Sequence, residues 1–235
     1  MISIVIPVFN EAECVEKHLK RIQNRISSPS LVKEIIVVDG GSNDNTIEKV
    51  KSFEDVLIIS SPKGRAKQMN FGAKQAKSEI LYFLHIDSLP PENFDKYIIE
   101  SVKKGSDAGC FKMKFRSRHP WLQFIGWLTR FKPRFCRGGD QSLFVTKSLF
   151  NKIGGYNEEF LIYEDHEILK HIYKYADFEV IPYWISTSAR RFREKGILKL
   201  QFLFLMVYFK KWTGATPEEL FKFYQKHIDE SSKKA

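Results

Sequence analysis

The sequence of 235 residues has few cysteines and no two of them close together. Cys14, Cys110 and Cys136 are odd in number and form no C-x-x-C motif. Disulfide frameworks and zinc knuckles need paired cysteines, so this pattern argues against both and is typical of a reducing compartment. Stability must then come from a hydrophobic core, for which 43% hydrophobic and 14% aromatic residues are sufficient.

Long hydrophobic runs are also missing. No stretch of about 20 uncharged apolar residues occurs, so we expect no membrane-spanning helix. The first residues lack the basic segment of a signal peptide, and Pro7 ends their apolar run early, so they are predicted to form a strand. We therefore expect a cytoplasmic protein of one large domain, or of one domain with an appended element.

A glycine-rich loop is absent after the first predicted strand, where residues 7–11 stand instead. Dinucleotide dehydrogenases carry G-x-G-x-x-G at that place, so this class is excluded. A nucleotidyltransferase would carry a glycine-rich basic loop there, and it remains only as an alternative.

Acidic residues are outnumbered by basic ones, which gives a net charge of +10 and a pI near 9.4. Such a charge predicts an anionic partner: a nucleotide diphosphate, an anionic membrane or a nucleic acid. A non-catalytic basic protein that binds membrane or nucleic acid would explain the charge. It would not explain carboxylates at the ends of buried strands, and we do not expect a nucleic-acid partner.

Strand and helix patterns alternate through residue 104, which predicts right-handed βαβ crossovers and a parallel sheet. Strands are predicted at residues 2–9, 35–38, 56–59 and 80–84. Helices are predicted at residues 11–25, 65–76 and 91–104, with a further one capped by Asp44 or Asn45. Asn10 is expected to cap the first helix, with Glu13 completing a capping box.

Beyond residue 104 the regular alternation stops. Strands are predicted at residues 109–116, 141–146 and 178–184, and a Gly-Gly turn at 154–155. Helices are predicted at residues 120–131, 164–175, 196–212 and 217–228, the last of them capped by Thr216.

Polar residues follow two of the buried strands. The apolar run 80–84 predicts a strand buried on both faces, and His85 and Asp87 come directly after it. Ligands of parallel sheets bind outside the carboxyl ends of the strands, so Asp87 is placed to hold a divalent cation. His85 suits Mn²⁺ better than Mg²⁺, although an indirect or structural role for it is favoured. Asp39, followed by Gly40 and Gly41, accepts hydrogen bonds either from a base or ribose or from its own turn.

Charged residues also gather where helices are predicted to begin. Lys63, Arg65 and Lys67 near a helix N-terminus are unfavourable unless an anion binds there, and for Lys67 a solvated face is the better interpretation. Residues 164–167 place three carboxylates together, which raises their pKa values and suits a general base. Ordinary placement of acids at a helix start is the alternative.

Taken together, these motifs resemble those of the family 2 glycosyltransferases of the GT-A fold. The resemblance covers about the first 195 residues and rests on Val5-Ile6-Pro7-Val8-Phe9-Asn10-Glu11, Val37-Val38-Asp39-Gly40-Gly41-Ser42-Asn43-Asp44, Gly64-Arg65-Ala66-x-x-x-Asn70-x-Gly72, Phe83-Leu84-His85-Ile86-Asp87, Gly139-Asp140-Gln141, Gly154-Gly155-Tyr156 and Glu164-Asp165. His85 replaces the first aspartate of the family's D-x-D motif, as in a small bacterial subgroup. The Q-x-x-R-W motif is absent, and Ser188-Ala189-Arg190-Arg191-Phe192 lies in its place.

The resemblance implies an α/β protein with a mostly parallel, Rossmann-like sheet and C-terminal helices. Its domain would span residues 1–195 and consist of a nucleotide-sugar half (1–104) and an acceptor half (105–195). A helical extension (196–235) would follow the domain. The implied activity is inverting transfer from a UDP- or GDP-sugar to a hydroxyl of a sugar or lipid-linked acceptor, with Mn²⁺ or Mg²⁺ as cofactor.

The resemblance also implies roles for single residues. Asp87 would hold the metal, and Asp165 would be the catalytic base. The donor would be bound by Pro7, Phe9, Glu11, Asp39, Ser42, Lys63, Arg65, Asn70 and His85, and by Arg190 and Arg191 on the grounds of their position and charge. Asp140, Gln141 and Glu164 would lie on the acceptor side.

The predicted helix Ile197–Trp212 contains an apolar stretch, residues 202–209, with lysines on both sides. Its 16 residues reach only ~24 Å, short of the ~30 Å hydrocarbon layer of a bilayer. It is therefore either a helix of the core or of a homodimer, or an interfacial helix on anionic lipid at the inner face of the cell membrane. The aromatic segment 121–131 is a second candidate for membrane contact.

Overall fold

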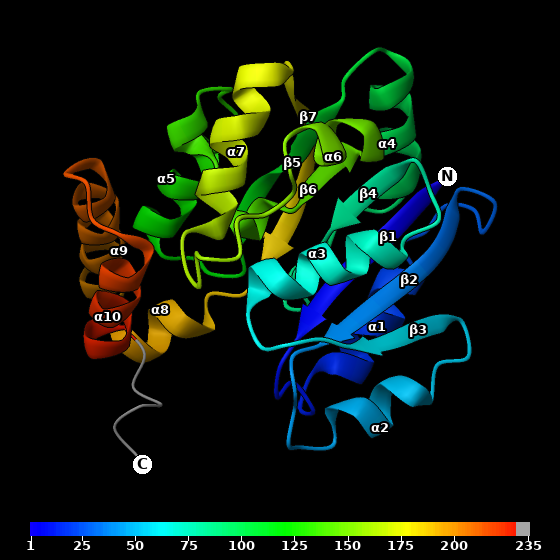
Figure 1. Cartoon of the computed structure of the whole chain (residues 1–235), viewed down its shortest axis with the longest axis horizontal. Coiled ribbons are helices and arrows are strands. Elements are labelled where there is room, and N and C mark those ends of the chain that lie inside the picture. The colour runs from blue at the N-terminus through cyan, green and yellow to red at the C-terminus, as the bar shows by residue number, and fades with distance from the viewer. Residues whose placement is uncertain (229–235) are drawn as a thin grey trace.

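The computed structural model describes residues 1–228, which form a seven-stranded sheet flanked by helices (Figure 1). The strand order is β3-β2-β1-β4-β6-β5-β7. The strands are β1 (Ile2–Val8), β2 (Val32–Asp39), β3 (Val56–Ser60), β4 (Ile80–Phe83), β5 (Ala108–Phe115), β6 (Leu143–Thr146) and β7 (Phe178–Thr187). The α-helices are α1 (Val15–Gln23), α2 (Thr46–Lys51), α3 (Arg65–Gln75), α4 (Phe94–Lys103), α5 (Pro120–Leu128), α6 (Lys147–Lys152), α7 (Glu164–Tyr175), α8 (Arg190–Lys195), α9 (Ile197–Trp212) and α10 (Pro217–His227).

The prediction of a mostly parallel sheet is confirmed. The strands β1 to β4 run parallel to one another, and β5 is parallel to β7. The exception is β6, which runs antiparallel to both β4 and β5. The apolar run at 80–84 therefore lies at the boundary of the parallel half and not, as predicted, in the middle of a parallel sheet.

The apolar strands are explained by hydrophobic clusters on both faces of the sheet. Tyr82 packs into the cluster that contains α1 and α4, whereas Leu81 and Phe83 pack into the cluster under α3 and α7. Gly72 allows α3 to approach β1 closely, because a Cβ there would lie 2.4 Å from Val5 Cγ1. This packing places the N-terminus of α3 at the carboxyl edge of the sheet.

The prediction for the first helix is wrong at its start. α1 begins at Val15, and Asn10 does not cap it. Asn10 has a φ of 53°, and its side-chain oxygen accepts a hydrogen bond from the Asn43 amide. The Asn10 side chain, which the local pattern predicted as a helix cap, instead joins the loop after β1 to the loop after β2.

Other local predictions agree with the structure. Thr216 caps α10 and forms a capping box with Glu219, and α7 has the predicted bounds. The six-residue helices α6 and α8 were not predicted, whereas α2, of the same length, was. The last seven residues of the predicted extension lie outside the described residues. Within residues 1–228, no helix has both the length and the apolar character needed to cross a bilayer.

Candidate active site

The turn after β2 is organised by Asp39, which is buried at the carboxyl edge of the sheet. Its carboxylate accepts hydrogen bonds from the Gly41 and Ser42 amides and from Ser42 Oγ at 2.5 Å. Ser42 Oγ in turn accepts one from the Asn10 amide at 2.8 Å. The sequence left open whether Asp39 bonds a base or ribose or its own turn, and the structure shows the bonds to its own turn. Together with the bond from Asn10, these contacts hold the loops after β1 and β2 together.

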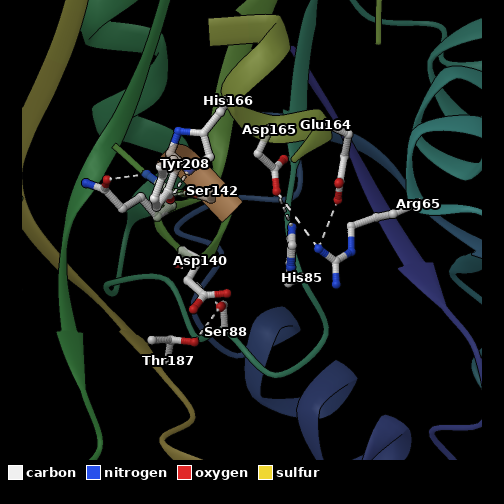
Figure 2. A network of polar contacts seen from close by, with 12 residues as sticks. Arg65, His85, Ser88, Asp140, Ser142, Glu164, Asp165, His166, Thr187 and Tyr208 are labelled. Atoms are coloured by element: carbon white, nitrogen blue, oxygen red, sulfur yellow. Dashed lines mark hydrogen bonds and ion pairs between the residues drawn. The ribbon is translucent and has the colours of Figure 1, made fainter. Parts of the chain in front are cut away.

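Two helix N-termini meet beside this edge, and their first residues form an ionic cluster (Figure 2). Arg65 begins α3, and its Nη1 lies 2.9 Å from Glu164 Oε1 and 4.0 Å from Asp165 Oδ2 at the start of α7. His85 Nε2, which follows β4, lies 3.9 Å from the same Asp165 oxygen. The structure thereby joins residues that are about 20 to 100 positions apart in the chain.

Asp165 is a largely buried carboxylate with an unusual proton affinity. Burial and the neighbouring Glu164 charge raise its pKa to about 8, and the Arg65 charge opposes this. The predicted rise in pKa is thus found at Asp165, where burial contributes more than the neighbouring acid. Burial and then the Arg65 charge lower the pKa of His85 to about 3, so this imidazole is neutral at pH 7.

The Asp165 carboxylate lies against the backbone of the short 3₁₀ helix η2 (Gly139–Gln141). A Cβ added to Gly139 would lie 1.9 Å from Asp165 Oδ2, whereas one on the preceding Gly138 would meet no atom within 4 Å. Glycine at position 139 is therefore a steric requirement for the position of this carboxylate.

Asp87 follows His85 by two residues in the loop after β4. Its carbonyl oxygen accepts a hydrogen bond of 3.0 Å from Arg116 Nη2, while within residues 1–228 no hydrogen bond or ion pair engages its carboxylate. Burial and then the Asp87 charge raise the pKa of Asp140 to about 6. Burial likewise raises the pKa of Glu11, and the Asp87 charge adds to it.

These neighbours bear on whether Asp87 could hold a metal ion. The described residues include no cluster of three His, Cys, Asp or Glu that could bind one on its own. A hard cation needs few carboxylates where phosphate oxygens and water complete its coordination shell. A cation would also relieve the electrostatic repulsion between Asp87 and the carboxylates of Asp140 and Glu11. The donor set therefore fits a divalent ion that is shared with a diphosphate, with Asp87 as the protein ligand.

The residues expected to bind a donor are spread around this edge. Lys63 Nζ lies 3.9 Å from the centre of the Phe9 ring, and Phe9 is partly exposed beside Pro7 and Glu11. On α8, the Arg190 charge opposes the rise in the pKa of Glu11, and the Arg191 charge opposes that of Asp140. Arg191 itself donates a hydrogen bond to the Tyr224 hydroxyl of α10.

Two predicted site residues make structural contacts. Asn70 donates to the Tyr156 carbonyl and accepts from the Tyr156 amide, each at 2.9 Å, and so joins α3 to the loop after α6. Gln141 is buried, donates to the Phe111 carbonyl and accepts from the Gly138 amide. Both hold loops of the site in place.

Sequence reasoning missed two contributors. No motif marks Arg116 in the sequence, yet its guanidinium donates a hydrogen bond to the backbone carbonyl of Asp87. Tyr208 of α9 lies 2.6 Å from His166 Nε2, one residue after Asp165 (Figure 2). No local signal connects α9 to the site, because the contact spans 42 residues.

The mostly parallel sheet, with acidic and basic residues at its carboxyl edge, is the architecture of the GT-A fold that glycosyltransferases share. The chain belongs to glycosyl transferase family 2, whose sequence model matches residues 3–155.

Curated relatives match less than half of the chain. The chain is 34% identical over 112 residues to the dolichol-phosphate mannosyltransferase of Pyrococcus furiosus, a match that covers 45% of this chain and 31% of the relative. It is 33% identical over 99 residues to the glycosyltransferase AglE of Haloferax volcanii, covering 40% and 32%. The chain thus matches about a third of the length of each relative.

Solved structures extend the likeness to most of the chain. TarS from S. aureus, solved in complex with UDP-GlcNAc, superimposes with a TM-score of 0.66 at 18% identity, over 80% of this chain and 58% of that one. The mannosyltransferase PcManGT from Pyrobaculum calidifontis, in complex with GDP-Man and Mn²⁺, has a TM-score of 0.64 at 16% identity, over 95% and 69%. At such identities the likeness establishes the fold alone.

Proposed function

We propose that this protein transfers a sugar from a UDP- or GDP-sugar to an acceptor hydroxyl with inversion, and that Asp165 is the general base. The observation that carries the proposal is the position of Asp165. Its buried carboxylate, with a pKa raised to about 8, lies at the N-terminus of α7 beside Arg65 and His85. UDP-GlcNAc and GDP-Man in the two similar structures support the donor class.

In this mechanism Asp165 takes the proton of the acceptor hydroxyl as its oxygen attacks the anomeric carbon. The bond from that carbon to the diphosphate breaks in the same step, which inverts the configuration. A divalent cation held by Asp87 would neutralise the charge of the departing diphosphate. Arg65 and Lys63 carry the positive charge at the start of α3 that draws the diphosphate to this edge.

A binding panel tests the proposed class of substrate. Thermal unfolding is measured with UDP-sugars or GDP-sugars plus Mn²⁺, and separately with an oligonucleotide. We expect stabilisation by at least one nucleotide sugar and none by the oligonucleotide. Stabilisation by the oligonucleotide alone would instead support a basic nucleic-acid-binding protein.

The pH dependence follows from the raised pKa of Asp165. Only the ionised carboxylate can accept a proton, so we expect kcat/KM to rise about tenfold per pH unit below pH 7 and to level off above the pKa. Initial rates at saturating metal between pH 5.5 and about 9 measure this. A profile that is flat from pH 5.5 upward would contradict a base with a raised pKa.

Stability has the opposite pH dependence. The native state retains the Asp165 proton up to about pH 8, whereas an unfolded aspartate loses it near 3.9. The native state therefore binds more protons between these values, so this group lowers the free energy of unfolding as pH rises through that window.

Gly139→Ala tests the position of the carboxylate. The new methyl group would displace Asp165, and a misplacement of about 1 Å can cost about 10²-fold in rate. We expect kcat to fall by about that factor while the thermal shift with the nucleotide sugar is retained. Gly138→Ala is the matched control, because its Cβ meets open space. Equal activity of the two variants would show that the close approach of Gly139 is irrelevant to catalysis.

A further inference from the structure

One face of α9 is apolar and points away from the core. Five large side chains on it have exposed fractions of 51–82%: Leu198, Phe202, Leu205, Phe209 and Trp212. They recur at spacings of four, three, four and three residues, so they form a single stripe along the helix. The opposite face packs into the core through Leu200 and Val207.

A second apolar group lies on α5, on the turn that follows it and on the short helix η1 (Arg134–Cys136). Four rings are exposed by 36–48% and pack in series, and a fifth, Phe135, is exposed by 86%. The four are Trp121, Phe124, Trp127 and Phe131. We call these five rings and the α9 stripe the aromatic surface.

The two parts of the aromatic surface border the same side of the active site. Tyr208 of α9 hydrogen-bonds to His166, and its ring centre lies 5.6 Å from that of Tyr163. The short helix η1 packs against α7. Burial and then the charge of Arg134 in η1 lower the pKa of His166 to about 4. Both elements therefore adjoin the start of α7, where Asp165 lies, and α5 and α9 lie at one end of the molecule (Figure 1).

The two segments of the sequence that carry this surface hold charges of one sign. No aspartate or glutamate occurs between Asp107 and Asp140, or between Glu194 and Glu218. These two segments hold all ten apolar side chains of the aromatic surface. The cations among them include Arg118, Arg130, Arg134, Lys199, Lys210 and Lys211.

We propose that the aromatic surface docks on an anionic lipid bilayer and turns the acceptor side of Asp165 toward the lipid. Exposed aromatic side chains with cationic neighbours are the pattern of a helix that lies in the plane of the interface. The 16 residues of α9 reach only ~24 Å, which is too short to span the membrane. Only the statement about Asp165 rests on the proposed function.

A second copy of the chain fits this surface less well. A symmetric contact would bring the same patch of both copies together. The cations of these two segments would then approach the same cations of the other copy, which opposes association. Anionic headgroups supply the missing negative charge.

Vesicle co-sedimentation of the whole chain tests the proposal. Vesicles of phosphatidylcholine alone are compared with vesicles that also contain phosphatidylglycerol. We expect binding to the anionic vesicles at low salt, and a reduction of about tenfold or more on neutral vesicles or at high salt, where charges are screened.

The triple variant Phe202→Glu/Leu205→Glu/Trp212→Glu is expected to lose at least about tenfold in vesicle binding. The control is Leu57→Glu/Phe71→Glu, which introduces two glutamates at exposed apolar residues of β3 and α3 and should bind as the unaltered chain does. Circular dichroism and the thermal shift with nucleotide sugar and Mn²⁺ establish that each variant is folded.

The outcomes separate this proposal from the proposed function. Vesicle binding without any nucleotide-sugar binding would leave the docking intact and overturn the transferase assignment. An unaltered chain that stays in the supernatant with both vesicle types at low salt, yet binds the nucleotide sugar, overturns the docking. A dimer that the triple variant dissociates, together with no vesicle binding, assigns the surface to a second copy and also overturns it.

Discussion

Asp165→Asn is expected to lower kcat for sugar transfer by about 10³-fold while donor binding is retained. A positioned general base contributes about 10²–10⁴-fold, and the amide keeps the shape of the side chain but cannot accept the proton. Arg65 keeps its ion pair with Glu164 at 2.9 Å, so the start of α3 should stay in place. Single-turnover rates and the thermal shift with donor and Mn²⁺ separate the two effects.

The same variant should be more stable than the unaltered chain above pH 8. Burial and Glu164 disfavour the ionised form of Asp165, so removal of the charge relieves a cost that grows as pH rises. Each kcal/mol gained raises Tm by about 2–4 °C in a chain of this size. A lower Tm of Asp165→Asn at pH 9 would contradict this assignment.

Glu167→Gln is the matched control for Asp165→Asn. This residue lies on the same helix, is also buried, and pairs with Lys170 and His171 away from Arg65. We expect its kcat to stay within about threefold of the unaltered value, because the base is untouched. If Asp165→Asn also retained transfer within threefold, Asp165 could not be the base.

Asp87→Asn is expected to lower the rate of transfer by about 10³-fold and to weaken the binding of Mn²⁺. A Lewis-acidic cation contributes several kcal/mol to stabilising the leaving charge, and each 1.36 kcal/mol is a factor of about ten. The carbonyl oxygen of residue 87, and not its side chain, accepts the bond from Arg116, so the loop should keep its position. Titration of Mn²⁺ in the presence of a nucleoside diphosphate measures the affinity, and chelation of the metal in the unaltered chain should reproduce the loss of rate.

The control for Asp87→Asn is Glu92→Gln, an exposed acid five positions on. It removes the same charge without touching the edge of the sheet, so its metal dependence should be unchanged. An Asp87→Asn variant with the same Mn²⁺ requirement as the unaltered chain would remove Asp87 from the metal site.

Local patterns in the sequence predicted much of the fold. Buried strands show as apolar runs, as at residues 80–84, because both faces of the sheet are covered. The bounds of α7 followed from its periodicity, and Thr216 from a capping box. Asn10 shows the limit: its side chain contacts Asn43, 33 residues away, and no local pattern reveals which of two partners it binds.

The sequence predicted at which edge of the sheet the candidate site lies, but not which side chains contact one another there. Asp39 and Asp87 end strands, so their common edge follows from the parallel order. The pairing of Arg65 with Glu164 spans 99 residues, and the fit of Asp165 against Gly139 depends on fractions of an ångström. The spacing of residues in the sequence reveals neither this pairing nor this fit.

The sequence by itself determined the class of fold, the carboxylates at the sheet's edge and the excess of positive charge, because each of these depends on residue type and local order. Only the tertiary structure decided that α9 adjoins the active site, that Asp165 is buried with a raised pKa, and that ten apolar side chains face outward. Burial and electrostatic environment are sums over neighbours from distant parts of the chain. They exist only after the chain has folded.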